Sequence, residues 1–166
     1  MQVSIKKIIL ATDFSDASND AGCHALLLAH TYKAKLKVLH VFDVGAWNVP
    51  SQHYLTTGGF DLTAGGLELT TEELDRLAES QEQVRQRGKD ALKKLADSFD
   101  LEVETIFTEG DPGHEIVRVA EELKADLIVL GTHGHSGWKR FTIGSVAEFV
   151  GRHAPCAVFT IRPKGK

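Results

Sequence analysis

Short apolar runs alternate with helix-like segments along nearly the whole chain, and this alternation constrains the fold more than any other feature. Runs with the length and composition of strands occupy 5–12, 36–41, 102–107, 127–130 and 156–161. Segments with helical signals separate them. Strands that alternate with helices in this way are typical of a parallel sheet covered on both faces. We therefore predict an α/β fold built on an open, five-stranded parallel sheet.

Four segments show the start signals or the apolar spacing of helices. Ser18 is a candidate N-cap for the first helix, whose apolar positions Ala21, Ala25, Leu28, Ala29 and Tyr32 fall at helical spacing. Thr70-Thr-Glu-Glu73 has the spacing of a capping box and would open a long second helix. The third begins near Gly110-Asp-Pro-Gly113, and the fourth spans 145–153. These helices would supply the two layers that a buried parallel sheet requires.

Length and composition indicate one globular domain. The chain has 166 residues, of which 42% are hydrophobic and 25% charged, enough for one sizeable core and too little for two. We expect a single domain over 1–166 with a long irregular insertion at about 43–69. A segment of that length without clear structure is either functional or disordered.

Charge and cysteine content exclude several classes of protein. The net charge of -4 and the scattered lysines and arginines argue against a nucleic-acid binder. Cys23 and Cys156, the two cysteines, indicate neither a disulfide framework nor a metal site. The N-terminal apolar run is too short for a signal peptide, and no run reaches the ~18 apolar residues of a membrane span. We therefore expect a cytoplasmic protein.

The segment from Gly131 to Ser145 carries the clearest functional signal, because it follows a buried strand and ends where a helix begins. Its glycines follow the pattern Gly-x2-Gly-x9-Gly-Ser. Glycines let backbone amides approach phosphate oxygens, and a helix N-terminus adds unpaired donors and partial positive charge. The chain has neither a P-loop nor the Gly-x-Gly of a dinucleotide fold. The pattern predicts a nucleotide-phosphate site; the alternative is a surface loop that uses glycine only to turn.

Topology leads to the same edge of the sheet. If the strand order is 3-2-1-4-5, the crevice where the order reverses lies between the first and fourth strands, and ligands of open α/β sheets bind there. Asp13 and Gly131 stand at the carboxyl ends of those two strands. The loop found by glycine spacing and the site expected from topology therefore coincide.

Several further segments match one known family. They are Lys7-Ile-Ile-Leu-Ala-Thr-Asp-Phe-Ser15, Leu39-His-Val41, Gly110-Asp-Pro, Ala125-Asp-Leu-Ile-Val-Leu-Gly-Thr-His-Gly134 and Pro155-Cys-Ala-Val. With the glycine pattern, they resemble the universal stress protein family, and in particular its ATP-binding branch. The resemblance covers nearly the whole chain except about 43–69. It implies a Rossmann-like fold of the adenine nucleotide alpha hydrolase type, with strand order 3-2-1-4-5 and helices on both faces.

The same resemblance implies an ATP site, with or without Mg²⁺, and a homodimer. The backbone around Ala11, Thr12 and Val41 would hold the adenine, and Asp13 with Gly131 would meet the ribose hydroxyls. The triphosphate would be surrounded by His133, Gly134, Gly144, Ser145 and Val146. Family members commonly pair partly through the last strand, and Cys156-Ala-Val-Phe159 is apolar on both faces, as an edge strand that gains a partner would be.

Three functions stay open at this point. The first is a regulatory stress-response dimer whose bound adenine nucleotide controls its conformation or its partners, since the phosphate loop comes without an evident base to activate water. The second is a slow ATPase or phosphotransferase in which Asp13 holds Mg²⁺. The third is a nucleotide-free interaction module that uses the 43–69 segment. We assign no catalytic residue.

Other reactive side chains favour structural interpretations. His133 and His135 have no carboxylate near them in the sequence, so we predict no metal site. Gly134-His-Ser-Gly137 lacks the spacing of a nucleophile elbow. Asp111 with His114 is better explained as a helix-start aspartate beside a surface histidine than as an acid–base pair.

Overall fold

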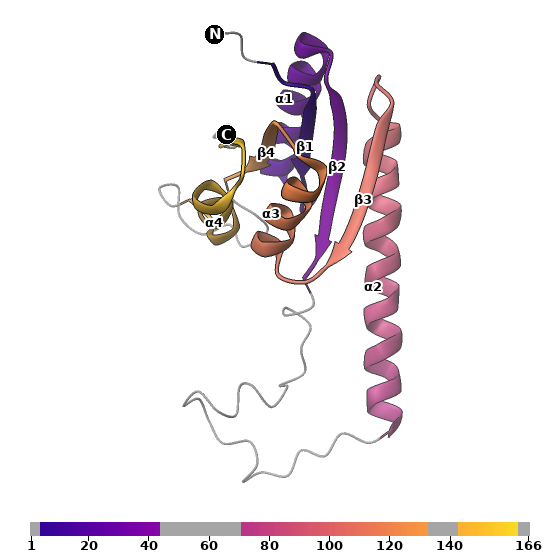
Figure 1. The fold of residues 1–166 in the computed structure, drawn as a ribbon. Helices are drawn as coiled ribbons and strands as arrows, with labels where there is room; N and C mark the ends of the chain where they lie inside the picture. The colour runs from indigo at the N-terminus through magenta and orange to yellow at the C-terminus, as the bar shows by residue number, and fades with distance from the viewer. Residues whose placement is uncertain (1–3, 44–70, 133–142, 163–166) are drawn as a thin grey trace.

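The computed structural model describes residues 4–43, 71–132 and 143–162, with the backbone alone for 71–78. Within these ranges lie five strands: β1 (Lys7–Ala11), β2 (Lys35–Phe42), β3 (Val103–Glu109), β4 (Leu127–Gly131) and β5 (Ala157–Ile161). Four helices lie between them in sequence: α1 (Asp16–Tyr32), α2 (Thr71–Asp97), α3 (Pro112–Leu123) and α4 (Ser145–His153). Figure 1 shows β1 to β4 side by side, with helices packed along them. The insertion expected at 43–69 falls almost wholly outside the described residues.

The sheet has the predicted order. All five strands are parallel and follow one another as β3-β2-β1-β4-β5. β1 lies at the centre, where Ala11 pairs with Leu39 of β2 on one side and with Leu130 of β4 on the other. The predicted fold class and strand order are therefore confirmed.

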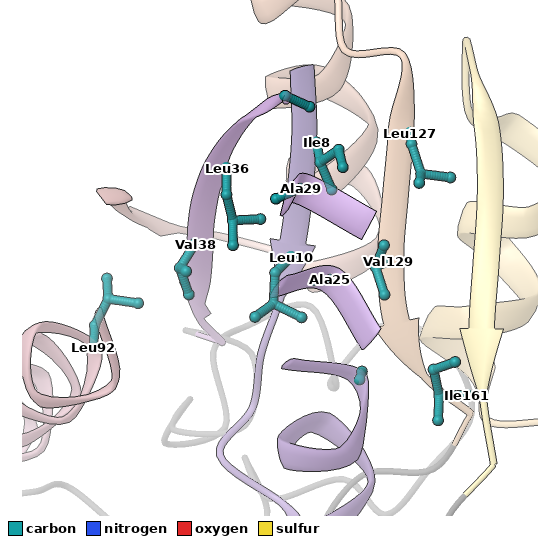
Figure 2. Packing of buried hydrophobic residues seen from close by; sticks show 12 residues of the cluster. Ile8, Leu10, Ala25, Ala29, Leu36, Val38, Leu92, Leu127, Val129 and Ile161 are labelled. Atoms are coloured by element: carbon teal, nitrogen blue, oxygen red, sulfur yellow. The ribbon is translucent and has the colours of Figure 1, made fainter. Parts of the chain in front are cut away.

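The two faces of the sheet bury separate hydrophobic clusters. Alternate residues of each central strand point to opposite faces, so Leu10 belongs to one cluster and Ile9 to the other. α1 and α2 cover the face of Leu10, and α3 and α4 cover the face of Ile9. Figure 2 shows the first cluster, in which strand side chains surround Ala25 and Ala29 of α1 while Leu92 approaches from α2. Small side chains on α1 let its backbone approach the sheet closely, which places the start of the helix against the strand ends.

The start of α1 differs from the prediction. Ser15, not Ser18, is the N-cap: its side chain accepts a hydrogen bond from the backbone N–H of Ser18 at 3.3 Å. The helix therefore begins at Asp16, earlier than Ser18 would allow. Tyr32, which shares the helical spacing of the apolar positions, is the last helical residue, and its side chain is 45% exposed.

The starts of the two helices on the other face are as expected. Pro112 is the first residue of α3, and the carboxylate of Asp111 accepts the backbone N–H of His114 at 3.0 Å. This is the helix-start aspartate beside an exposed histidine that the sequence indicated. α4 spans the predicted residues, from Ser145 to His153.

α2 is the longest of the described helices, and its first turns extend past the carboxyl ends of β2 and β3 (Figure 1). Its later turns contribute Leu92 and Leu95 to the cluster over β1 and β2. Within the described ranges, no helix combines the length and the apolar character needed to cross a membrane, and α2 itself is predominantly polar.

Candidate functional site

The reversal of strand order places the ends of β1 and β4 next to each other. From β1 the chain passes through α1 to β2 on one side, whereas β4 lies on the other side of β1. α1 lies on one face of the sheet and α4 on the other. In open α/β sheets, two neighbouring strands whose connections leave to opposite faces border the crevice where ligands bind. The residues that follow β1 and β4 therefore decide what can bind there.

The turn after β1 is held by a chain of hydrogen bonds that begins at Thr12. The backbone N–H of Thr12 donates to the carbonyl of Leu39 at 2.9 Å, which extends the β1–β2 ladder by one residue. The buried Thr12 hydroxyl donates to Oγ of Ser18 at 3.1 Å and accepts the N–H of Phe14 at 3.0 Å. Phe14 has φ of 64°, a left-handed conformation that a non-glycine residue adopts only when its surroundings enforce it. The turn is thus a fixed structure.

Asp13 lies within this turn, half-buried, with its carboxylate oriented by Ser15. Its Oδ1 accepts the hydroxyl of Ser15 at 2.6 Å and the backbone N–H of Ser15 at 3.1 Å. The Ser15 oxygen in turn accepts the N–H of Ser18 at the helix start, so one hydroxyl joins the carboxylate to α1. A carboxylate fixed at the carboxyl end of the central strand can accept hydrogen bonds from hydroxyl groups of a ligand.

His40 supports the turn from β2. Its Nδ1 lies 2.8 Å from the carbonyl oxygen of Thr12, and its ring centroid lies 4.5 Å from that of Phe14. Burial lowers the pKa of His40 below the usual value for an imidazole, although the hydrogen bond to Thr12 and the Asp13 carboxylate oppose that shift. The side chain is therefore best described as a neutral, hydrogen-bonded group packed behind the turn.

The chain after β4 is tied to both neighbouring elements. The N–H of the buried Thr132 donates to the carbonyl of Ile161 in β5 at 2.8 Å, and the carbonyl of Thr132 accepts the N–H of Gly144 at 2.7 Å. The second bond fixes the start of α4 beside the end of β4. His133 and Gly134, two of the predicted phosphate residues, lie outside the described residues.

The N-terminus of α4 faces this edge with little side-chain cover of its own. Gly144 is the N-cap and has no side chain with which to accept the first-turn amides. Ser145 follows as an exposed residue with a hydroxyl, and Val146 is half-buried. Amide donors and the positive end of a helix dipole are the features that bind phosphate in many proteins.

Three of the predicted adenine and phosphate residues share one apolar cluster. Ala11 from β1 is buried there, and Val41 from β2 and Val146 from α4 pack against it as half-buried side chains. They come from three elements, so only the fold brings them together. The structure thus brings the described members of the predicted set together at the carboxyl edge of the sheet. These members are Ala11, Thr12, Asp13, Val41, Gly131, Gly144, Ser145 and Val146.

No role in the site was predicted for three residues that shape this edge: Ser15, His40 and Thr132. Ser15 had a readable signal, because an aspartate two residues before a serine commonly forms a local side-chain turn. The roles of His40 and Thr132 depend on contacts with distant residues, for which the sequence offered no comparable signal.

The described residues offer no cluster of three or more His, Cys, Asp or Glu side chains that could hold a metal ion. Cys23 is exposed and Cys156 half-buried, and both are free thiols. A metal at this site would therefore depend on ligands brought by a bound molecule or by residues beyond those described.

Comparison with known proteins identifies the family. The sequence model of the Universal stress protein family matches residues 4–162. The chain belongs to the universal stress protein family. Universal stress protein MJ0531 of Methanocaldococcus jannaschii is 36% identical over 165 residues, an alignment that covers 97% of this chain and 84% of the relative. Universal stress protein UspA from Lactobacillus plantarum has a solved structure that matches with a TM-score of 0.68 at 25% identity, over 97% of this chain and all of that one.

Two solved structures with the same fold contain adenine nucleotides. One is a universal stress protein in complex with cAMP, which matches with a TM-score of 0.57 at 22% identity over 98% of this chain and 100% of that one. The other is a family member from Arabidopsis thaliana with AMP bound, with a TM-score of 0.58 at 18% identity over 96% of this chain and 93% of that one. At these identities the likeness to this chain is one of fold.

Gly131 is required by packing against α1. A Cβ atom at this position would lie 2.9 Å from the backbone carbonyl carbon of Ala17 and 3.0 Å from the backbone N of Ser18. We predict that Gly131→Ala lowers the free energy of unfolding by about 1–3 kcal/mol, because the backbone of α1 must move away. Urea unfolding monitored by circular dichroism measures this change.

Gly151→Ala is the matched control. A Cβ atom there meets nothing within 4 Å, and the position is helical, so alanine should raise the free energy of unfolding by about 0.5–1 kcal/mol. Equal stability of the two variants would contradict the packing role of Gly131.

Proposed function

We propose that this protein binds ATP at the crevice between β1 and β4 and that the bound nucleotide regulates the conformation or the partners of a homodimer. The observation that carries the proposal is the juxtaposition of two opposite polar features at one sheet edge. The start of α4 presents backbone donors, and the turn after β1 presents a fixed carboxylate. A nucleotide has the complementary groups, an anionic phosphate chain and a sugar with hydroxyl donors. The nucleotide-bound relatives support this choice of ligand class.

The phosphate chain would lie at the start of α4. Gly144 allows close approach to the first-turn amides, and Ser145 adds a hydroxyl donor. His133 and Gly134 belong to the same proposed group on the basis of the glycine pattern. Mg²⁺ would come with the phosphates, since Mg²⁺ in such sites is held by phosphate oxygens together with few protein ligands.

The sugar and the base would lie toward β1 and β2. The Asp13 carboxylate would accept the ribose hydroxyls next to Gly131, and Ala11, Val41 and Val146 would offer apolar contact to the base. The N–H of Thr12 is already used by Leu39, so Thr12 would contact the base through its carbonyl. That oxygen accepts His40 and has a second lone pair, which suits the exocyclic amine of adenine.

Ser145→Glu tests the phosphate site. A glutamate at the first helical position suits the helix dipole and should not destabilise the free protein, but its charge repels phosphate. We predict that the affinity for ATP falls about tenfold or more in isothermal titration calorimetry, since ~1.4 kcal/mol of repulsion suffices. For the unmodified protein, a dissociation constant of about 10 μM would give ~2.7 kcal/mol of stabilisation at about 1 mM ATP.

Ser98→Glu is the control, because Ser98 is an exposed serine directly after the C-terminal end of α2. It should bind ATP as the unmodified protein does. If both variants bound ATP with equal affinity, a phosphate site at the start of α4 would be contradicted. If millimolar ATP did not raise the melting temperature of the unmodified protein, this proposal would be contradicted and the nucleotide-free interaction module would be favoured.

The homodimer is proposed to form through β5. This strand is at the edge of the sheet, with β4 as its neighbour within the chain. Ala157 and Phe159 are exposed and Val158 is half-buried, so apolar atoms are accessible on this strand. Exposed apolar edges of this kind commonly pair with another chain.

Phe159→Glu should dissociate this dimer. Phe159 is 42% exposed on β5, and a buried unpaired charge would oppose association. Tyr32→Glu, at an aromatic residue that is 45% exposed at the end of α1, is the control and should stay dimeric. Analytical ultracentrifugation measures the oligomeric state of both variants. A dimeric Phe159→Glu variant, or a monomeric unmodified protein at tens of micromolar, would contradict the β5 interface.

A further inference from the structure

His40 occupies a position between three elements. Its ring lies 4.5 Å from Phe14 of the β1–α1 turn and 5.7 Å from Phe107 of β3, measured between ring centroids. On α2, a Cβ atom added to Gly88 would lie 3.4 Å from Nε2 of His40 and 3.2 Å from the Phe107 ring. The absence of a side chain at Gly88 thus lets α2 pack directly over the imidazole.

The hydrogen bond to Thr12 determines the tautomer of His40. A carbonyl oxygen only accepts, so Nδ1, at 2.8 Å from it, carries the proton. Neutral His40 therefore has an unprotonated Nε2, and this nitrogen is the one next to Gly88. Of the groups around the ring, the Asp13 carboxylate favours the protonated form, whereas burial disfavours it.

This bond acts on the peptide that precedes Asp13. The carbonyl of Thr12 belongs to the same peptide group as the N–H of Asp13, so the orientation of this group affects the direction of the Asp13 side chain. The next residue, Phe14, has φ of 64° and rests its ring on His40. A turn with one residue in the left-handed region needs such external support, because the conformation is unfavourable by itself.

We propose that His40 is a positioning residue for the nucleotide site: its Nδ1–H holds the Thr12 carbonyl, and thereby sets the turn that presents the Asp13 carboxylate to the ligand. The inference rests on the proposed function for its ligand. It adds a physical route between the outer helix α2 and the site, because the same imidazole lies where a side chain at Gly88 would contact it. A movement of α2 toward the sheet would displace His40 and the turn with it.

Two substitutions at His40 separate the hydrogen bond from the packing of the ring. His40→Asn retains an N–H donor at the place of Nδ1 and loses most of the ring. His40→Phe retains a ring and loses the donor. If His40 positions the turn, the ATP affinity of His40→Phe falls about tenfold or more while His40→Asn stays closer to the unmodified protein. If His40 only fills space, the order reverses, and the proposal is overturned.

Gly88→Ala provides a test that leaves His40 in place. Alanine is the better helix former, so α2 should not be weakened, yet the added methyl group presses on Phe107 and His40. We expect weaker ATP binding together with altered NMR signals of the His40 ring and the Asp13 amide. Gly151→Ala, on the exposed side of α4, is the matched control and should change neither the ATP affinity nor these NMR signals. Unchanged binding and unchanged His40 signals in Gly88→Ala would overturn the route from α2.

The nucleotide-free protein gives a result that does not depend on ligand binding. Long-range ¹H–¹⁵N NMR spectra of the unmodified protein near pH 7.5 should show His40 as the Nδ1–H tautomer, and the Asp13 amide should shift in His40→Phe. An Nε2–H tautomer would overturn the positioning role whether or not ATP binds. Failure of the unmodified protein to bind ATP, with the Nδ1–H tautomer present, would instead refute the proposed function and leave His40 as a support of the turn.

Discussion

β1 pairs with both β2 and β4, and this double pairing positions the other elements of the fold. It places β1 at the centre of the sheet and brings the ends of β1 and β4 to one edge. The first turn of α1 approaches so closely that Gly131 admits no side chain, and the chain after Thr132 returns at Gly144 to begin α4. Every described residue of the proposed site is positioned by this pairing or by an element that packs directly on it.

The site combines a rigid half with a half that depends on backbone groups. On the β1 side, the hydrogen bonds among Thr12, Asp13, Ser15 and Ser18 fix a carboxylate before any ligand arrives. On the β4 side, the donors belong to the start of a helix, whose amides point outward by the geometry of the helix itself. Such preorganisation lowers the entropic cost of binding, because few side chains need to be ordered.

Much of the fold could be predicted from the sequence, because buried parallel strands leave continuous apolar runs and helix ends leave local signals. The run ending at Leu130, the aspartate cap before Pro112 and the span of α4 are examples. Ser18 was mistaken for the cap because it too precedes a helical pattern, and only the backbone geometry shows that Ser15 occupies that position. The support from His40 could not be predicted, since its partner Thr12 lies 28 residues earlier and the contact exists only once β1 and β2 are paired. The carboxyl-edge location followed from topology, whereas the packing role of Gly131 required the position of α1.

In the proposed complex, an adenine nucleotide lies between the end of β1 and the start of α4. Titration of the ¹⁵N-labelled protein with ATP, followed by amide chemical shifts, tests it most directly. We predict that the largest shifts among the described residues occur at Asp13, Gly131, Ser145 and Val146. Amides at the amino ends of the strands, such as Lys35 and Asp126, should stay unchanged. Shifts centred elsewhere, or none at millimolar ATP, would contradict it.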